Sequence, residues 1–547
     1  MATRGEAVHD GGRVPDPTSD KFESESGEDT RQSKIQSRIQ KIIGLKKYAR
    51  DYRVIKTGCL VLAWVAMGLY HRLPSPTLID LKDRLGVNYE EISRVLLCHT
   101  IGYFLSNMAA GVVVDLYPAL VDMVIASSLL AAAVGSIGTP WSRSLALTGI
   151  CQLLTGFGHG ATDTAGTVTV LQLWGDNSAP ALHIIHMGYP FIAILVPFMA
   201  QPFLSRRPEV NGTATPPPLT VEEAWRTSRI EQAYLIPTFV SAAVCVIFLA
   251  FHFYFSPKYQ PDLSRPDFLA CFKPKKKQQP DPDSTDPDST YPDSTGPDPE
   301  QQPFWSRFFS CWSSKLCLSF KELFSPDRCV KGEPVLGSFY VVMLFLFYLT
   351  YLAGEASLFE YLFAYSVESG LFDKDGATLV YSCFWAFFLI GRGFGAFGSH
   401  WVPLGLLIGL SIFLLQIVGI EYSVWGVNDS TVFWVLTCAA GFCCGPNFPA
   451  CSSWANHYLN VTGVIVVVMF VGASFGGMIG TYATGYFFEY AGIDSMFHGY
   501  IGYVAITILV FSTMQFSVSV LFKDRMQRAA EQDQEEEEPE VEAITKV

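Results

Sequence analysis

The sequence has little charge for its length. Only 16% of its 547 residues are Asp, Glu, Lys or Arg, whereas 50% are hydrophobic, and soluble proteins contain about a quarter charged residues. The apolar residues gather in runs of roughly 20, which is the length of helix that crosses a bilayer. This composition excludes an ordinary soluble domain. It predicts an all-α membrane protein that crosses the bilayer many times.

The sequence predicts no cleavable leader peptide, no disulfide framework and no metal-ligand motif. Its first fifty residues are polar, so the first transmembrane helix is expected to direct insertion. The 13 cysteines lie almost all inside apolar runs or in a long middle loop, without the spacing of a disulfide scaffold. No nucleophile–base pair and no ligand set stands at a productive spacing, which argues against an enzyme and predicts no resident cofactor.

Twelve apolar segments are predicted to cross the membrane, six on each side of a long polar insertion. They cover 55–73, 92–114, 117–138, 145–173, 181–204 and 233–255, and then 337–365, 376–398, 402–421, 432–455, 461–488 and 498–522. A Gly-Phe-x-x-Gly element occurs at Gly156–Gly160 in the fourth segment and again at Gly441–Gly445 in the tenth. The repeat predicts two duplicated six-helix halves, as in many secondary transporters, and its small residues also allow close helix packing.

The chain therefore divides into five predicted parts. They are a cytoplasmic N-terminal tail (1–53), a first half (54–255), a cytoplasmic linker (256–336), a second half (337–522) and an acidic cytoplasmic tail (523–547). The linker contains DPDSTDPDSTYPDST, whose prolines and like charges predict disorder. Much of the net charge of −13 comes from this linker and the acidic tail, so it indicates no substrate and no nucleic-acid partner.

Basic residues mark one predicted side of the membrane. They precede the first span, lie in the linker as KPKKK and follow the last span as KDRMQR, so these segments and both termini are expected to be cytoplasmic. The segment 34–48 is either an amphipathic helix on the inner leaflet or a solvated basic arm. The sequons at Asn211 and Asn428 fall in outside loops of this topology and predict glycosylation. The membrane is then the plasma membrane or an endomembrane reached by secretion.

The fourth span carries a polar stripe. Residues on one face of that helix are Gln152, Thr155, His159, Thr162, Asp163, Gly166 and Thr169. A charge at the bilayer centre costs about 2.5–3.5 kcal/mol, so this face is expected to line a wet central cavity. Asp163 and His159 are predicted to handle a coupling sodium ion or proton, or else to form a structural hydrogen bond. His183 and His186 could complete a metal-ligand set with them, but no second-shell pattern supports a metal site.

The second half adds candidate solute-binding residues. Glu355 lies inside the seventh span, four residues after Tyr351, with Glu360 nearer the outer mouth, and Trp385 lies in the eighth span. Aromatic rings beside carboxylates and amides suit a sugar, because its C–H faces stack on rings and its hydroxyls take hydrogen bonds. Ordinary helix packing is the alternative for the rings. The other hydroxyl-binding candidates are Gln152, Gln172 and Asn447, and the gating candidates at the cytoplasmic side are Asp115 and Arg392.

Five stretches together resemble the major facilitator superfamily, and within it the animal sodium-dependent glucose transporters, which are related to fucose-permease-type sugar symporters. They are GFGHGATDTAGTVTVLQLWGD, YLAGEASLFEYLFAY, FWAFFLIGR, GFCCGPNFP and VTGVIVVVMFVGASFGGMIG. The resemblance implies a rocker-switch carrier with its sugar site between the halves. It also implies that Asp163 and Glu355 occupy the family's acidic positions of the fourth and seventh spans.

Three departures from that family keep other functions open. No basic residue follows Gly111–Asp115, Gly477 stands where relatives have an acid, and the first span has no acid between positions 55 and 70. We expect a hexose transporter coupled to sodium or protons, with a uniporter or a carrier of another small polar solute as the alternative. A lipid-like organic anion is disfavoured, because Arg392 is the one clear buried cation of the spans. A non-transporting receptor or scaffold, with cytosolic partners on the linker and acidic tail, is a third hypothesis.

Overall fold

The computed structural model describes residues 52–174, 178–205, 219–255, 334–398, 401–458 and 463–521. Both predicted tails, the linker repeat and the sequon at Asn211 lie outside the described residues. Two compact units are distinguished, residues 1–57 and residues 58–547, and all contacts discussed below lie within the second unit.

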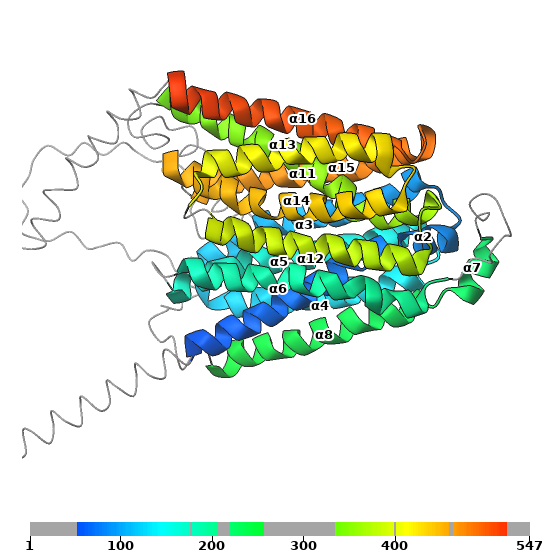
Figure 1. The fold of residues 1–547 in the computed structure, drawn as a ribbon. Coiled ribbons are helices and arrows are strands. Elements are labelled where there is room, and N and C mark those ends of the chain that lie inside the picture. Colours follow the sequence, from blue (N-terminus) through cyan, green and yellow to red (C-terminus); the bar gives the residue numbers. More distant parts are fainter. Residues whose placement is uncertain are drawn as a thin grey trace, which may run out of the picture. The chain divides into compact units, whose positions relative to one another are not determined.

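Every regular element in the described residues is a helix (Figure 1). The first predicted half begins with a helical segment at 52–72 and a turn at Leu73. It continues with α2 (Pro74–Leu85), α3 (Tyr89–Leu116), α4 (Val121–Trp141), α5 (Leu145–Trp174), α6 (Ser178–Ala200), α7 (Val221–Thr227) and α8 (Ile230–Ala250). The short helices α2 and α7 are not among the predicted spans. Because α2 follows the first helix after a single turn residue, the first span is longer than its predicted end at residue 73.

The second predicted half repeats this pattern of long helices. It consists of α11 (Pro334–Glu368), α12 (Lys374–Gly398), α13 (Leu404–Glu421), α14 (Ser430–Tyr458), α15 (Gly463–Tyr490) and α16 (Ser495–Phe516). The predicted repeat glycines lie at equivalent contacts in the two halves. A side chain at Gly156 of α5 would collide with the backbone of His99 on α3, and one at Gly441 of α14 would collide with the backbone of Phe384 on α12. These glycines let the helices of each pair pack backbone to backbone.

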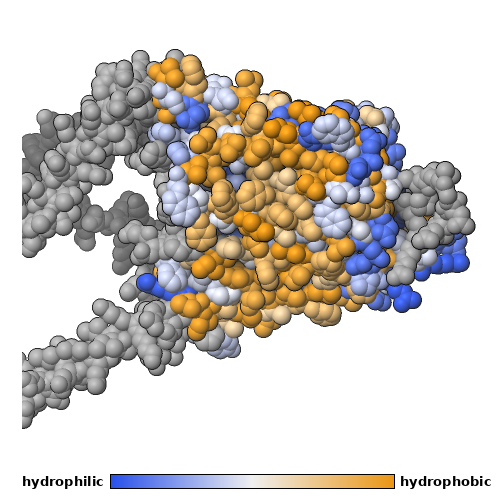
Figure 2. Space-filling view, viewed as in Figure 1, coloured by the Kyte–Doolittle hydropathy of each residue, from blue (hydrophilic) through white to orange (hydrophobic). Residues whose placement is uncertain are grey.

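The composition of the helices is that of a multi-pass membrane protein. Within the described residues, ten helices are long and apolar enough to cross a membrane. The polar stripe of α5 lowers the hydropathy of that long helix, which is not among the ten. Apolar residues cover the middle of the face shown in Figure 2, and hydrophilic residues gather at the end that carries α2 and α7. The all-α membrane fold is confirmed, whereas the count of twelve spans stays a prediction.

Three helix pairs join the predicted halves. The helix α3 packs against α15, α6 packs against α12, and α2 packs against α11. The residues between these pairs are the natural place for a site that both halves share, because each half contributes one wall.

Candidate functional site

A buried ion pair connects the two halves. Arg72, at the end of the first helix, lies 3.2 Å from the carboxylate of Glu360 on α11, and their side chains are 3% and 12% exposed. Three rings surround the guanidinium carbon of Arg72, those of Tyr189 at 5.8 Å, Phe359 at 5.4 Å and Trp385 at 5.4 Å. We call these rings the aromatic cage. The cage has members from α6, α11 and α12, so both halves build it.

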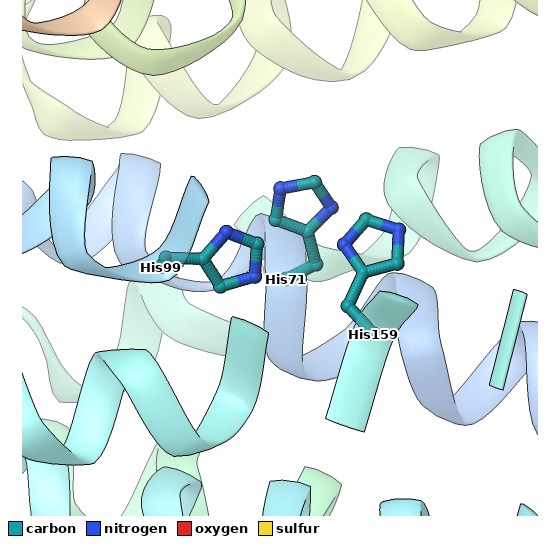
Figure 3. A group of neighbouring side chains, drawn as sticks. All are labelled: His71, His99 and His159. Atoms are coloured by element: carbon teal, nitrogen blue, oxygen red, sulfur yellow. The ribbon is translucent and has the colours of Figure 1, made fainter. Parts of the chain in front are cut away.

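Three histidines from three different helices converge beside this pair (Figure 3). The ring centroid of His71 lies 4.4 Å from that of His99 on α3 and 4.3 Å from that of His159 on α5. Arg72 donates to Nε2 of His71 at 2.5 Å, and the hydroxyl of Tyr189 lies 2.7 Å from Nδ1 of the same ring. We call His71, His99 and His159 the histidine cluster. It is linked directly to the ion pair through Arg72.

A small cavity of about 30 Å³ lies between the histidine cluster and the ion pair. Its lining residues are His71, Pro74, Leu96, His99, Thr100, Gln152, Glu360 and Thr481. A volume of this size holds a water molecule or two, whereas pockets for organic ligands measure roughly 300 Å³ or more. The space itself therefore fits an ion or water, and an organic solute needs more room than it offers.

The end of the bundle that carries α2 is held shut by polar contacts between the halves. Lys374 at the start of α12 lies 2.5 Å from Asp80 on α2. The backbone N–H of Tyr89 donates to Glu489 at 2.9 Å, and the hydroxyl of Tyr89 donates to Glu368 at 3.0 Å. The capping box of Asn88 fixes the first turn of α3, and with it the position of Tyr89. The central cavity is closed at this end.

Several predicted site residues meet at this centre. Gln152 is buried, lines the cavity and donates to Thr139 at 3.2 Å. His159 belongs to the histidine cluster, and Trp385 belongs to the aromatic cage. Asp163 is half-buried one turn beyond His159 and accepts a hydrogen bond from Tyr103 at 3.1 Å. Within the described residues no hydrogen bond joins Asp163 to His159, so the structural pairing considered from the sequence is not formed here.

A second polar cluster lies inside the second half. The hydroxyl of Tyr351 donates to the carbonyl of Cys444 at 2.7 Å and to Glu355 at 3.3 Å. Glu355 is buried, and Asn447 donates to the carbonyl of Cys443 at 2.7 Å while its own side-chain oxygen has no partner. These predicted residues therefore share one neighbourhood. None of them lines the small central cavity.

The remaining predicted residues lie elsewhere. Gln172 is exposed, because it follows His159 by roughly 20 Å along α5. Arg392 is half-buried and donates to the carbonyl of Gly445 at 3.3 Å. Asn428 is exposed just before α14, whereas Asn211 and the side chain of Asp115 lie outside what the structure describes. The gating and glycosylation roles stay predictions.

Sequence reasoning missed the residues that organise the centre. Arg72 stood at the predicted end of the first span and was not among the predicted site residues, and Glu360 was placed nearer the outer mouth. The expectation that Arg392 is the one clear buried cation is wrong, because Arg72 is only 3% exposed. The helical segment that follows residue 73 could have located Arg72. Because α2 prolongs the first span, Arg72 lies inside the span and not at its end.

Comparison with known proteins identifies the family. A sequence model of the Major Facilitator Superfamily matches residues 59–481, and the chain belongs to this superfamily. It is therefore a membrane transporter and not an enzyme, as predicted. The mouse (Mus musculus) sodium-dependent glucose transporter 1A is 21% identical over 423 residues, which cover 76% of this chain and 85% of that protein.

Two solved structures show the same fold. The nucleoside transporter NupG gives a TM-score of 0.52 at 13% identity, covering 84% of this chain and 99% of its own. The E. coli fucose:proton symporter FucP gives 0.50 at 12% identity, covering 84% of this chain and 98% of its own.

Proposed function

We propose that the chain moves a hexose across its membrane and that a sodium or proton gradient drives this transport. The observation that carries the proposal is the buried pair of Arg72 and Glu360 inside the aromatic cage, at the contact between the halves. A carboxylate and a guanidinium bind sugar hydroxyls, and the rings stack on the apolar faces of a pyranose. The names of two similar proteins, a sodium-dependent glucose transporter and a fucose:proton symporter, support this solute class.

Transport requires the site to open alternately to the two ends. The cavity of about 30 Å³ is too small for a hexose, so the solute enters an arrangement in which the halves have moved apart. Residues 54–255 then rock against residues 337–522. Opening at the α2 end separates Arg72 from Glu360 and Asp80 from Lys374, and sugar hydroxyls take the place of the broken contacts. By the distribution of basic residues, this end is the extracellular one.

Asp163 is the proposed coupling residue. Its carboxylate and the hydroxyl of Tyr103, 3.1 Å apart, offer oxygen atoms to a sodium ion or a site to a proton. His159 lies one turn away, and its ring centroid is 4.6 Å from that of Tyr103. An ion bound here would alter the packing of α3 on α5. Because these two helices carry His99 and His159, the change would reach the histidine cluster. A uniporter is the alternative mode, in which Asp163 binds no coupling ion.

An acidic solute is a second candidate. Nε and Nη1 of Arg72 are buried donors without hydrogen-bond partners, and a carboxylate of the solute could take both. Glu360 opposes this binding unless the solute displaces it from Arg72. The observation therefore favours a sugar acid over a larger organic anion.

Uptake of labelled solutes by cells that express the full chain separates these candidates. We expect hexose uptake that falls at least tenfold in Trp385→Ala, because the ring that faces Arg72 is lost, at equal amounts of protein in the membrane. The matched control is Trp401→Ala, since Trp401 is 81% exposed. Uptake of a hexuronate in preference to the hexose would favour the acidic solute. Equal hexose uptake in both variants would refute the cage as the sugar site.

A further inference from the structure

The histidine cluster has the composition of a metal site rather than of a sugar site. One ring nitrogen from each of His71, His99 and His159 can be chosen so that all three lie within 4.8 Å of one another. Tetrahedral zinc holds imidazole nitrogens at about 2.0–2.1 Å, which places them roughly 3.4 Å apart. Small rotations of the three side chains close that difference. Figure 3 shows the three rings lying beside one another.

Two of these rings carry unused ligand atoms. Nε2 of His99 and Nδ1 of His159 are buried and have no hydrogen-bond partner, and His99 is only 7% exposed. A buried polar nitrogen without a partner costs about 1–3 kcal/mol, which a ligand at that point would recover. The adjoining cavity of about 30 Å³, lined by His71 and His99, has room for an ion and a water molecule.

The helices that carry the ligands are held in place. Gly156 on α5 packs against the backbone of His99 itself, so α3 and α5 approach closely at the level of the cluster. The distance between His99 and His159 is thus set by helix packing and not by mobile loops. Ligands on rigid elements are the arrangement that metal sites require.

We propose that His71, His99 and His159 bind a divalent transition-metal ion of the zinc class. Imidazole nitrogen suits zinc, copper, nickel or iron, whereas sodium, calcium and magnesium prefer oxygen ligands. Three histidines leave one coordination position open toward the cavity, for water or a solute hydroxyl. This site is distinct from the oxygen-lined coupling site proposed at Asp163. It requires neither hexose transport nor ion coupling.

Arg72 competes with the metal for His71. Its Nη2 donates to Nε2 of His71 at 2.5 Å, and its positive charge repels a bound cation. Glu360, 3.2 Å from Arg72, compensates that charge. Metal binding through Nε2 of His71 therefore displaces Arg72 from the ring. The guanidinium of Arg72 then contacts Glu360 and the solute. It follows that removing the Arg72 charge strengthens metal binding, whereas removing any of the three rings weakens it.

The test measures metal binding by the purified full chain in detergent, with Zn²⁺ in calorimetry and Co²⁺ in visible absorption. We expect one equivalent whose affinity falls about tenfold or more in His71→Gln, His99→Gln and His159→Gln, and rises in Arg72→Gln. The tetrahedral Co²⁺ spectrum disappears in the three histidine variants. The matched control is His498→Gln, an exposed histidine at the start of α16 that stays at wild-type affinity.

Folding of each variant is checked by its elution as a single species before metal is added. Equal metal affinity of the wild type and all three histidine variants would overturn the proposal. So would a wild type that binds no metal ion. If Arg72→Gln binds less metal than the wild type, the competition between Arg72 and the metal is refuted. Hexose uptake is measured separately, so failure of the transport proposal leaves this result unchanged.

Discussion

The pair between Arg72 and Glu360 is predicted to stabilise the closed arrangement of the halves. Both side chains are buried there, at 3% and 12% exposure, and they face water once the halves separate. Removing one partner of a buried ion pair leaves an uncompensated charge and costs about 3–5 kcal/mol. Because that cost falls on the closed arrangement alone, Glu360→Gln shifts the equilibrium toward the open one by about 100-fold or more.

Labelling of a cysteine in the cavity measures this shift. Thr481 lines the cavity and is 3% exposed, so Thr481→Cys reports opening through its rate of reaction with a maleimide on the purified chain. The same variants without Thr481→Cys give the background from native cysteines. We expect Glu360→Gln to raise the labelling rate at least tenfold. In the double variant Arg72→Gln, Glu360→Gln the labelling rate should fall most of the way back to that of the parent, because no unpaired charge is left.

The control is an ion pair that lies within one half and is partly buried. Arg84 on α2 lies 2.6 Å from Glu231 on α8, and both belong to the first half. Glu231→Gln breaks a pair within one half and leaves the labelling rate unchanged. If Glu360→Gln labels no faster than its parent, or if the double variant labels as fast as the single one, Arg72 and Glu360 do not hold the halves together.

Two further variants test the packing and the coupling site. Gly156→Ala is expected to lower the thermal stability of the purified chain, because its new methyl group meets the carbonyl of His99. Gly502 has open space around it, so Gly502→Ala should be neutral or stabilising. Equal melting temperatures for the two variants would refute the close α3–α5 contact. Asp163→Asn should keep the chain folded and remove the dependence of uptake on sodium or protons, and retained ion dependence at normal expression would exclude Asp163 as the coupling residue.

The periodic features of the sequence predicted the fold well. Apolar runs located the long helices, and the repeated glycines at Gly156 and Gly441 predicted close contacts that the structure places at equivalent positions in both halves. The helical spacing of the polar stripe predicted that Gln152 and His159, seven residues apart, share a face, and the structure has both near the centre. These are local properties, and local spacing is what a single sequence contains.

The centre itself depends on contacts that no local spacing encodes. His71, His99 and His159 come from three helices, and the polar neighbours of each one along its own helix say nothing about the other two. Arg72 was hidden by the assumed end of the first span. Gln172 was a predicted hydroxyl-binding residue of the fourth span, yet its distance along α5 places it away from the cavity in an exposed position. Convergence of side chains is a tertiary property, so only the packed helices reveal it.

Coupled hexose transport is the central claim, and flux into proteoliposomes tests it most directly. The purified full chain is reconstituted, and labelled hexose is offered with an inward sodium gradient, an inward proton gradient or no gradient. The account predicts accumulation above the outside concentration under one of the two gradients, and mere equilibration in Asp163→Asn. Hexose uptake no greater than that of protein-free liposomes under every condition, from protein that elutes as a single species, would contradict it.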